Sequence, residues 1–103
     1  MRQKILITGA SSGIGKATAG LLLKRNSSVF LHSKTPEKLA AEFPETPGIA
    51  SDLTAPGAAS EVVEKAAAAL GGLDVVIHCA GVGLIKPALE TTDAEFTRVM
   101  NIN

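Results

Sequence analysis

The residues best suited to chemistry stand near the start of the chain, where three glycines follow a short apolar run. The segment Thr8-Gly9-Ala10-Ser11-Ser12-Gly13-Ile14-Gly15 comes directly after Ile5-Leu6-Ile7 and opens a pattern of helical periodicity. A strand, a glycine turn and a helix N-terminus in this order present free backbone N–H groups that bind phosphate. The alternative, a merely structural glycine turn, is disfavoured because strand, turn and helix coincide.

Each glycine of this turn has a separate expected task. Gly9 lets the chain reverse after the strand, Gly13 removes the Cβ that would hold a diphosphate away from the backbone, and Gly15 lets the helix lie close to the strand. Ser11 and Ser12 offer hydroxyl groups to the same anion. Apolar residues at helical spacing then predict the inward face of the first helix: Ile14, Ala17, Leu21 and Leu22.

The rest of the chain supplies the elements that must position this turn. Residues 29–31 predict a second strand, Thr35-Pro36 begins a short helix that ends near Phe43-Pro44, and residues 48–51 predict a brief third strand. A longer helix is predicted from about Pro56 to the cap at Gly71. Its expected apolar face consists of Ala59, Val62, Val63, Ala66 and Leu70.

The continuous apolar run of residues 74–78 predicts a fourth, buried parallel strand, closed by Cys79-Ala80-Gly81. After a loop through Lys86-Pro87, residues 92–95 form a capping-box pattern, and the following helix is expected to turn Phe96, Val99 and Met100 inward. Alternating strands and helices predict an α/β fold, a Rossmann-like doubly wound parallel sheet of about four strands in the order 3-2-1-4. Because no helix stop signal precedes the last residue, we expect residues 1–103 to be the N-terminal portion of a truncated domain.

Composition and charge narrow the function classes. The chain has 103 residues, of which 46% are hydrophobic and 3% aromatic, as expected for one small aliphatic domain. Ten basic and ten acidic side chains cancel, which argues against nucleic acid or an anionic membrane as the partner. The single cysteine, Cys79, excludes an internal disulfide and a cysteine-based zinc site. With no signal-peptide pattern at the start, we expect a cytoplasmic protein without a metal centre.

Four motifs, in order along the chain, resemble the short-chain dehydrogenases/reductases, in particular 3-oxoacyl-carrier-protein reductases and similar carbonyl reductases. Residues 8–15 are similar to the family's Thr-Gly-x-x-x-Gly-x-Gly fingerprint, and Asp52-Leu53 to the pair that the family places beside the adenine ring. Cys79-Ala80-Gly81 is similar to its Asn-Ala-Gly. Asn103 resembles the helix asparagine that holds a water beside the catalytic lysine, and it is the one catalytic candidate in this chain.

Two departures from the family pattern stand out. His78-Cys79 replaces the family's paired asparagines, which leaves backbone contacts to the ribose but removes the amide side chains. The family's catalytic serine and Tyr-x-x-x-Lys are absent, because the chain contains no tyrosine. The resemblance therefore implies that these residues belong to sequence beyond Asn103, and that the chain alone is inactive.

The resemblance implies an NADP-dependent oxidoreductase that transfers a hydride between nicotinamide and a small-molecule carbonyl or secondary alcohol. This chain would supply mainly the cofactor site, and the full-length protein would be a homo-oligomer. The expected cofactor-binding residues are Gly9, Ser11, Ser12, Gly13, Ile14, Gly15, Ser33, Lys34, Asp52, Leu53, Cys79, Ala80 and Gly81. Two alternatives stay open: a dinucleotide-binding or interaction module without catalysis, and a half-domain that self-associates through its open sheet edge.

Charge at the end of the second strand predicts the cofactor. A carboxylate there would bind a ribose 2′-hydroxyl, whereas Ser33-Lys34 offers a cation, which favours NADP(H) over NAD(H). The alternatives are that Lys34 is an ordinary solvated lysine and that Asp52 belongs only to the turn into the next helix. We expect His78 to be a strand-end histidine, and His32 to have no partner and no catalytic role.

Overall fold

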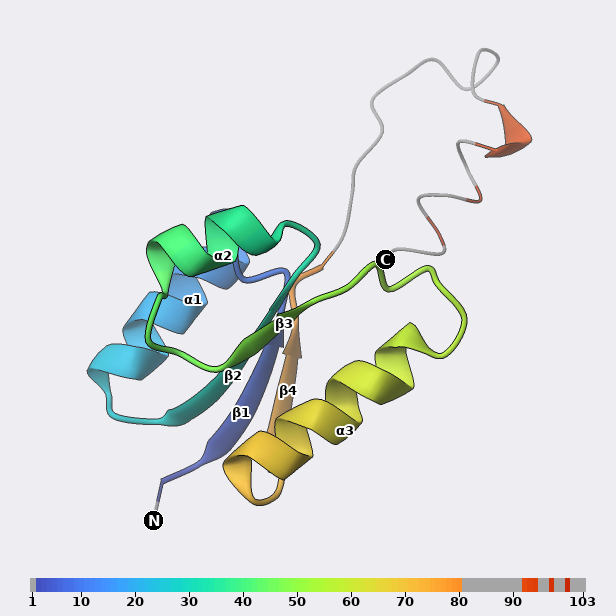
Figure 1. The fold of residues 1–103 in the computed structure, drawn as a ribbon. Coiled ribbons are helices and arrows are strands. Elements are labelled where there is room, and N and C mark those ends of the chain that lie inside the picture. Colours follow the sequence, from blue (N-terminus) through green and yellow to red (C-terminus); the bar gives the residue numbers. More distant parts are fainter. Residues whose placement is uncertain (1, 81–91, 95–96, 98–99, 101–103) are drawn as a thin grey trace.

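Four parallel strands form one sheet whose order is β3-β2-β1-β4, as the sequence predicts. The computed structural model describes residues 2–80, 92–94, 97 and 100 (Figure 1). The strands are β1 (Lys4–Thr8), β2 (Ser28–Ser33), β3 (Gly48–Ala50) and β4 (Val75–His78). The helices are α1 (Gly13–Lys24), α2 (Pro36–Glu42) and α3 (Ala58–Leu70). Each expected element up to residue 80 is thus present, and α2 begins at Pro36 after the N-cap residue Thr35.

Two apolar layers hold helices to the two faces of the sheet. Helices α1 and α2 cover one face and α3 covers the other (Figure 1). Neighbouring residues of one strand point to opposite faces, so Ile5 and Ile7 pack under α1 while Leu6 packs under α3. Val62 and Ala66 of α3 complete the second layer. Because both faces of β1 and β2 are covered, their carboxyl ends are fixed relative to each other.

The inward face of α1 differs from the one that the apolar spacing predicts. Ile14 and Leu21 are 79% and 52% exposed, and Ala17 is exposed as well. The buried positions are Gly15 and Ala19, followed by the partly buried Leu22. The reason is the contact at Gly15: its Cα lies so close to the Gly9 carbonyl that an added Cβ would collide with it. That contact fixes the rotation of α1, and residues 19 and 22 then follow at helical spacing.

Three further expectations about burial are wrong in part. On α3, Ala59 and Val63 are exposed, because the face that meets the sheet is formed by Ala58, Val62 and Ala66. In β4, Val76 is 50% exposed, because no described helix covers the α3 face of this outermost strand. The described residues 93, 94, 97 and 100 are helical, as expected, but Met100 is 62% exposed instead of inward-facing. No described element packs over it. Phe96, Val99, Lys86 and Pro87 lie outside the described residues.

Candidate cofactor-binding site

A cavity of about 450 Å³ opens at the carboxyl ends of the strands, where parallel α/β sheets bind ligands. It gathers segments that are far apart in the sequence: the glycine turn, the ends of β2 and β3, and the residues after β4. Its lining residues are Gly9, Ser11, Ser12, Gly13, Ile14, Gly15, His32, Ser33, Lys34, Thr35, Lys38, Ser51, Asp52, Leu53, Cys79 and Ala80. Every expected cofactor-binding residue except Gly81 is therefore brought together here. Gly81 and Asn103 lie outside the described residues.

The glycine turn owes its shape to two close backbone approaches. Gly9 has a φ of +67°, and a Cβ there would lie 2.7 Å from the Cα of Ala80. Gly15 touches the turn from the helix side, through its contact with the Gly9 carbonyl. Gly13 also has a positive φ, +56°, but its Cβ would point into open space. Gly9 and Gly15 are thus required by packing, whereas Gly13 leaves the cavity open to a ligand.

The N-terminus of α1 has neither a side-chain cap nor an acidic residue in its first turn, which suits it to binding an anion. Its N-cap residue, Ser12, makes no side-chain hydrogen bond to the first turn, and no acidic residue lies in that turn. The first-turn N–H groups of a helix carry partial positive charge and need acceptors. A diphosphate fits this place, because it would accept from these N–H groups and approach closely over Gly13.

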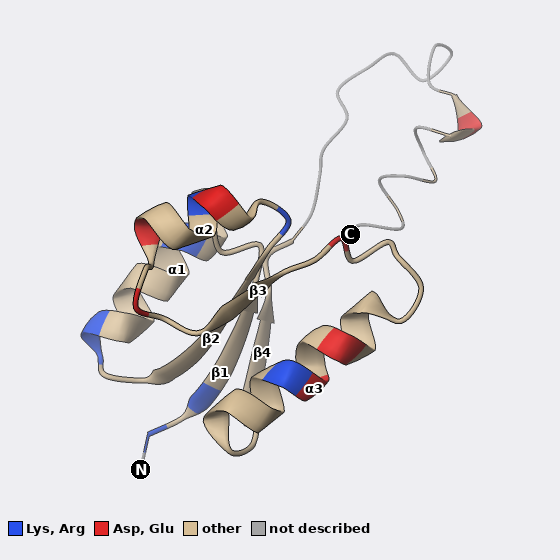
Figure 2. Cartoon of the chain, viewed as in Figure 1, with Lys and Arg blue, Asp and Glu red and all other residues tan. Residues whose placement is uncertain are grey.

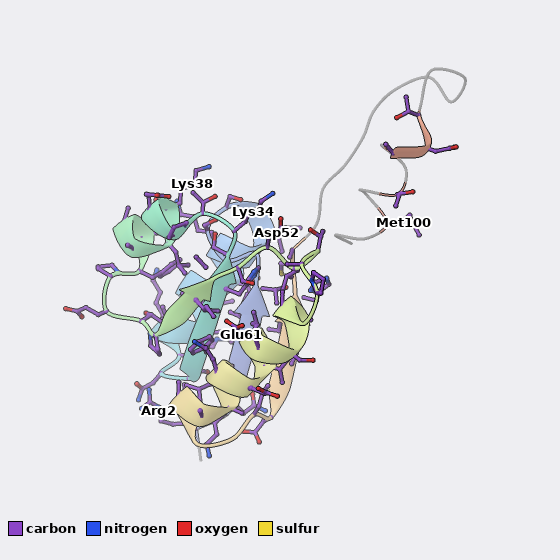
Figure 3. The ribbon with its side chains drawn as sticks, turned by 45° about the vertical axis from the view of Figure 1, so that its right-hand side comes forward. Arg2, Lys34, Lys38, Asp52, Glu61 and Met100 are labelled. Atoms are coloured by element: carbon purple, nitrogen blue, oxygen red, sulfur yellow. The ribbon has the colours of Figure 1, made fainter. Side chains whose placement is uncertain are left out.

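Hydroxyl and ammonium groups surround the end of β2. The Ser33 hydroxyl donates to Ser11 Oγ at 2.7 Å and accepts from the Thr35 N–H at 3.0 Å. Lys34 and Lys38 both line the cavity and lie along the same rim (Figure 3). Elsewhere in the described chain, lysine and arginine are spread over several elements (Figure 2). The end of β2 therefore combines two cations with hydroxyl donors.

Asp52 takes part in two different contacts. Its Oδ1 accepts from the Thr54 N–H at 3.0 Å and from the Thr54 hydroxyl at 2.6 Å, so the carboxylate does help form the turn that leads to α3. Its Oδ2 lies 3.9 Å from Lys34 Nζ. Asp52 and Leu53 also line the cavity. The turn-forming alternative is therefore present in the structure, together with a place in the cavity wall.

Thr8 joins the end of β1 to the end of β4. Its Oγ1 accepts the backbone N–H groups of Cys79 and Ala80, at 3.1 and 3.2 Å. The same hydroxyl is 2.7 Å from His78 Nδ1, and with both lone pairs used it donates its proton to that nitrogen. His78 is exposed and does not line the cavity, in keeping with the expected strand-end role.

His32 is the main residue that sequence reasoning missed. It was expected to have no partner, but the residue is only 2% exposed and both ring nitrogens are hydrogen-bonded. Burial, the largest cause, lowers its pKa from the ordinary 6.5. A histidine in an otherwise apolar strand needs partners when buried, and that was the available signal. Three more lining residues were missed, Thr35, Lys38 and Ser51. Lys38 gave no signal in the sequence, because its place at the cavity depends on how α2 follows β2.

We also searched the part of the chain that the structure describes for metal-binding clusters and for membrane-spanning helices. No group of three or more His, Cys, Asp or Glu side chains is placed to hold a metal ion there. No helix within the same residues is both long and apolar enough to span a membrane.

Comparisons with known proteins identify the family of the chain. The model of the short chain dehydrogenase family matches residues 3–103. A hydroxynaphthalene reductase-like protein, Arp2, from Metarhizium majus (strain ARSEF 297) is 34% identical over 106 residues, which cover 95% of this chain and 40% of the relative. The chain thus spans about two fifths of the length of that curated relative.

Solved structures are similar over nearly the whole chain. The TT0495 protein from Thermus thermophilus has a TM-score of 0.86 at 38% identity, covering 99% of this chain and 42% of that one. The 3-ketoacyl-(acyl-carrier-protein) reductase from Brucella melitensis, complexed with NADH, has a TM-score of 0.90 at 25% identity, covering 97% and 43%. Because the family model matches residues 3–103, the chain belongs to the short-chain dehydrogenases.

Proposed function

We propose that the protein containing this chain is an NADP-dependent oxidoreductase, and that this chain supplies the adenosine and diphosphate part of its cofactor site. The observation that carries the proposal is the cavity itself, which is lined by an uncapped helix N-terminus, by Lys34 directly after β2 and by Lys38 on α2. A nicotinamide dinucleotide is further supported by the NADH complex of the Brucella melitensis reductase.

The preference for NADP(H) rests on the charges around the end of β2. A 2′-phosphate carries close to two negative charges at neutral pH and would meet Lys34, Lys38 and the serine hydroxyls. The carboxylate that lines the cavity, Asp52, lies 3.9 Å from Lys34 Nζ. NADH has a neutral 2′-hydroxyl in place of this phosphate, so NADPH gains the larger electrostatic attraction at the end of β2.

The proposed reaction is hydride transfer between the cofactor and a small-molecule carbonyl or secondary alcohol. When bound, the cofactor supplies or accepts the hydride at nicotinamide C4. The residues of this chain hold the diphosphate at α1 and orient the ribose with the backbone after β4. We place the proton donor in sequence that continues beyond Asn103, because the chain has no tyrosine. We therefore expect the 103-residue chain to bind cofactor without turnover. We also propose that the whole protein is a cytoplasmic homo-oligomer.

Calorimetric titration of the chain with NADPH and NADH tests the cofactor half of this proposal. We expect saturable binding, with NADPH bound about tenfold more tightly, the difference that one or two charge-assisted hydrogen bonds make. Equal affinities would overturn the NADP preference, and no binding of either would overturn the site.

Turnover tests the other half, using a form of the protein that continues through a Tyr-x-x-x-Lys segment. NADPH oxidation in the presence of a panel of ketones and aldehydes is the expected outcome. Cofactor binding without reduction of any carbonyl compound would favour the non-catalytic module instead.

A further inference from the structure

The ring of His32 connects two loops that both line the cavity. The Gly9 N–H donates to Nδ1 at 3.2 Å, and Nε2 lies 2.9 Å from the Ser51 carbonyl oxygen. The backbone of the same residue takes part, since the Ala10 N–H donates to the His32 carbonyl at 2.8 Å. Residue 32 therefore holds the glycine turn through its ring and its main chain, and holds the loop after β3 through its ring.

These partners leave only one tautomer for the ring. A backbone N–H can only donate, so Nδ1 must be unprotonated, and a carbonyl can only accept, so Nε2 must carry the hydrogen. A protonated ring would bring a second hydrogen to Nδ1, facing the Gly9 N–H. The imidazolium cannot accept from Gly9, and the contact between the ring and the turn would be lost.

The surroundings of the ring also favour its neutral form. His32 is buried, and desolvation is the main cause of its lowered pKa, with the hydrogen bond to Ser51 opposing it and His78 adding to it. The glycine turn carries no titratable side chain, and the face of α3 that meets the sheet consists of Ala58, Val62 and Ala66. Beyond Ser51, Lys34 and Asp52 form an ion pair at 3.9 Å, so their opposite charges largely cancel at the His32 ring. The hydrogen-bond partners of the two ring nitrogens are both backbone groups, at Gly9 and Ser51.

We propose that His32 is a positioning residue for the dinucleotide: its neutral ring holds the Gly9 turn against the loop after β3, and its protonation breaks the ring's hydrogen bond to that turn and weakens binding of the diphosphate. This inference rests on the proposed cofactor function and adds to it a pH dependence within the acidic range. The ring acts on the ligand through the Gly9 backbone.

The first test observes the hydrogen bond between the Gly9 N–H and the His32 ring in the absence of any ligand. ¹⁵N NMR of the histidine rings should show His32 with hydrogen on Nε2 at pH 7.5. The Gly9 amide resonance should shift on acidification with the same midpoint as the His32 ring, and this midpoint should lie below 6.5. His78→Asn, which changes the other histidine of the sheet, should keep both signals. A hydrogen on Nδ1, or a Gly9 amide that ignores the titration, would overturn the inference.

The second test measures affinity against pH. NAD⁺ is the probe because it lacks a 2′-phosphate, a group that itself titrates near pH 6. We expect the affinity to fall about three- to tenfold between pH 7.5 and pH 5, the effect of one lost hydrogen bond. His32→Asn places an amide oxygen near Nδ1 and does not titrate, so its affinity for NAD⁺, whatever its value at pH 7.5, should stay the same down to pH 5.

The outcomes separate the two proposals. An affinity that falls equally with pH in the unmodified chain and in His32→Asn would refute the role of His32 while leaving the cofactor site intact. A chain that binds no dinucleotide, although Gly9 follows the His32 titration, would refute the proposed function and with it the binding part of this inference. His32→Leu, which removes both ring contacts, should bind more weakly than His32→Asn if it folds.

Discussion

At the scale of single residues, Gly13 and Gly15 have opposite reasons to be glycine. Gly15→Ala would push a Cβ into the Gly9 carbonyl, and we expect a loss of about 3 kcal/mol in the free energy of unfolding, as for overpacking in a tight core. Gly13→Ala meets open space but keeps a φ of +56°, which costs about 1 kcal/mol.

Urea denaturation and dinucleotide titration together distinguish the two glycines. Gly15→Ala should lower the unfolding midpoint much more than Gly13→Ala. Gly13→Ala should fold but bind NADPH more weakly, because its methyl group would occupy the approach to the diphosphate. Equal midpoints for the two variants would contradict the packing role of Gly15.

Lys34 is the residue on which the cofactor preference should depend. Lys34→Glu exchanges attraction for repulsion toward a 2′-phosphate, so we expect NADPH affinity to fall about tenfold or more, the equivalent of a charge-assisted hydrogen bond of roughly 1.5 kcal/mol. NADH affinity should change little or rise. Calorimetry at moderate salt measures both. Lys65→Glu, an exposed lysine on α3, makes the same charge change away from the cavity and should leave the preference as it is.

At the scale of elements, the rotation of α1 decides which of two adjacent leucines stabilises the fold. Leu22 packs against the core layer, whereas Leu21 is 52% exposed. We expect Leu22→Ala to cost about 2 kcal/mol of unfolding free energy, at the lower end for a partly buried leucine. Leu21→Ala should cost at most about 0.5 kcal/mol. Chemical denaturation of the matched pair checks this, and a larger loss for Leu21→Ala would place the helix in the other rotation.

The same helix shows what local patterns can and cannot predict. The apolar runs and the glycine and proline signals predicted every strand and helix up to residue 80, because burial on both sides makes parallel strands continuously apolar. Counting apolar residues gave the wrong buried face for α1. The close backbone contact at Gly15 sets the rotation of this helix, and Ile14 is left exposed as a result. The same count missed that Val63 of α3 is exposed. Which face of a helix is buried depends on close contacts with other elements, and the apolar pattern of the helix alone does not predict those contacts.

The site was predictable where its residues follow one another and less so where the fold joins them. The glycine turn and the cation at Lys34 could be read directly from the sequence. The partners of His32 could not, because Gly9 and Ser51 lie 23 and 19 residues away from it along the chain. Lys38 required knowledge of how α2 follows β2. The roles of Gly81 and Asn103 stay predictions, since both residues lie outside the described ones.

At the scale of the whole molecule, the described sheet ends at β4, whose outer edge has no described partner strand. Val76 on this strand is 50% exposed, and the net charge of zero gives no repulsion between molecules. We therefore expect the 103-residue chain to self-associate with rising concentration. Val76→Lys should raise the concentration needed for association several-fold, measured by sedimentation velocity.

A control on α3 tests whether the strand is responsible. Val63 is 43% exposed, so Val63→Lys removes a similar apolar surface without altering the sheet edge. It should change the association little. An equal effect of the two lysines would point to apolar surface in general instead of to the β4 edge.

The contact between Gly9 and Ala80 has a consequence for how the protein is made. Thr8 Oγ1 bonds the N–H groups of residues that are 71 and 72 positions further along the chain, and the Gly9 turn rests against that same backbone. Contacts of such large sequence separation form late in folding, after local helices and neighbouring strands. During synthesis the glycine turn therefore lacks these contacts until residue 80 has left the ribosome and β4 has joined β1. A nascent chain stalled before β4 should possess the glycine sequence and still be unable to retain a nucleotide.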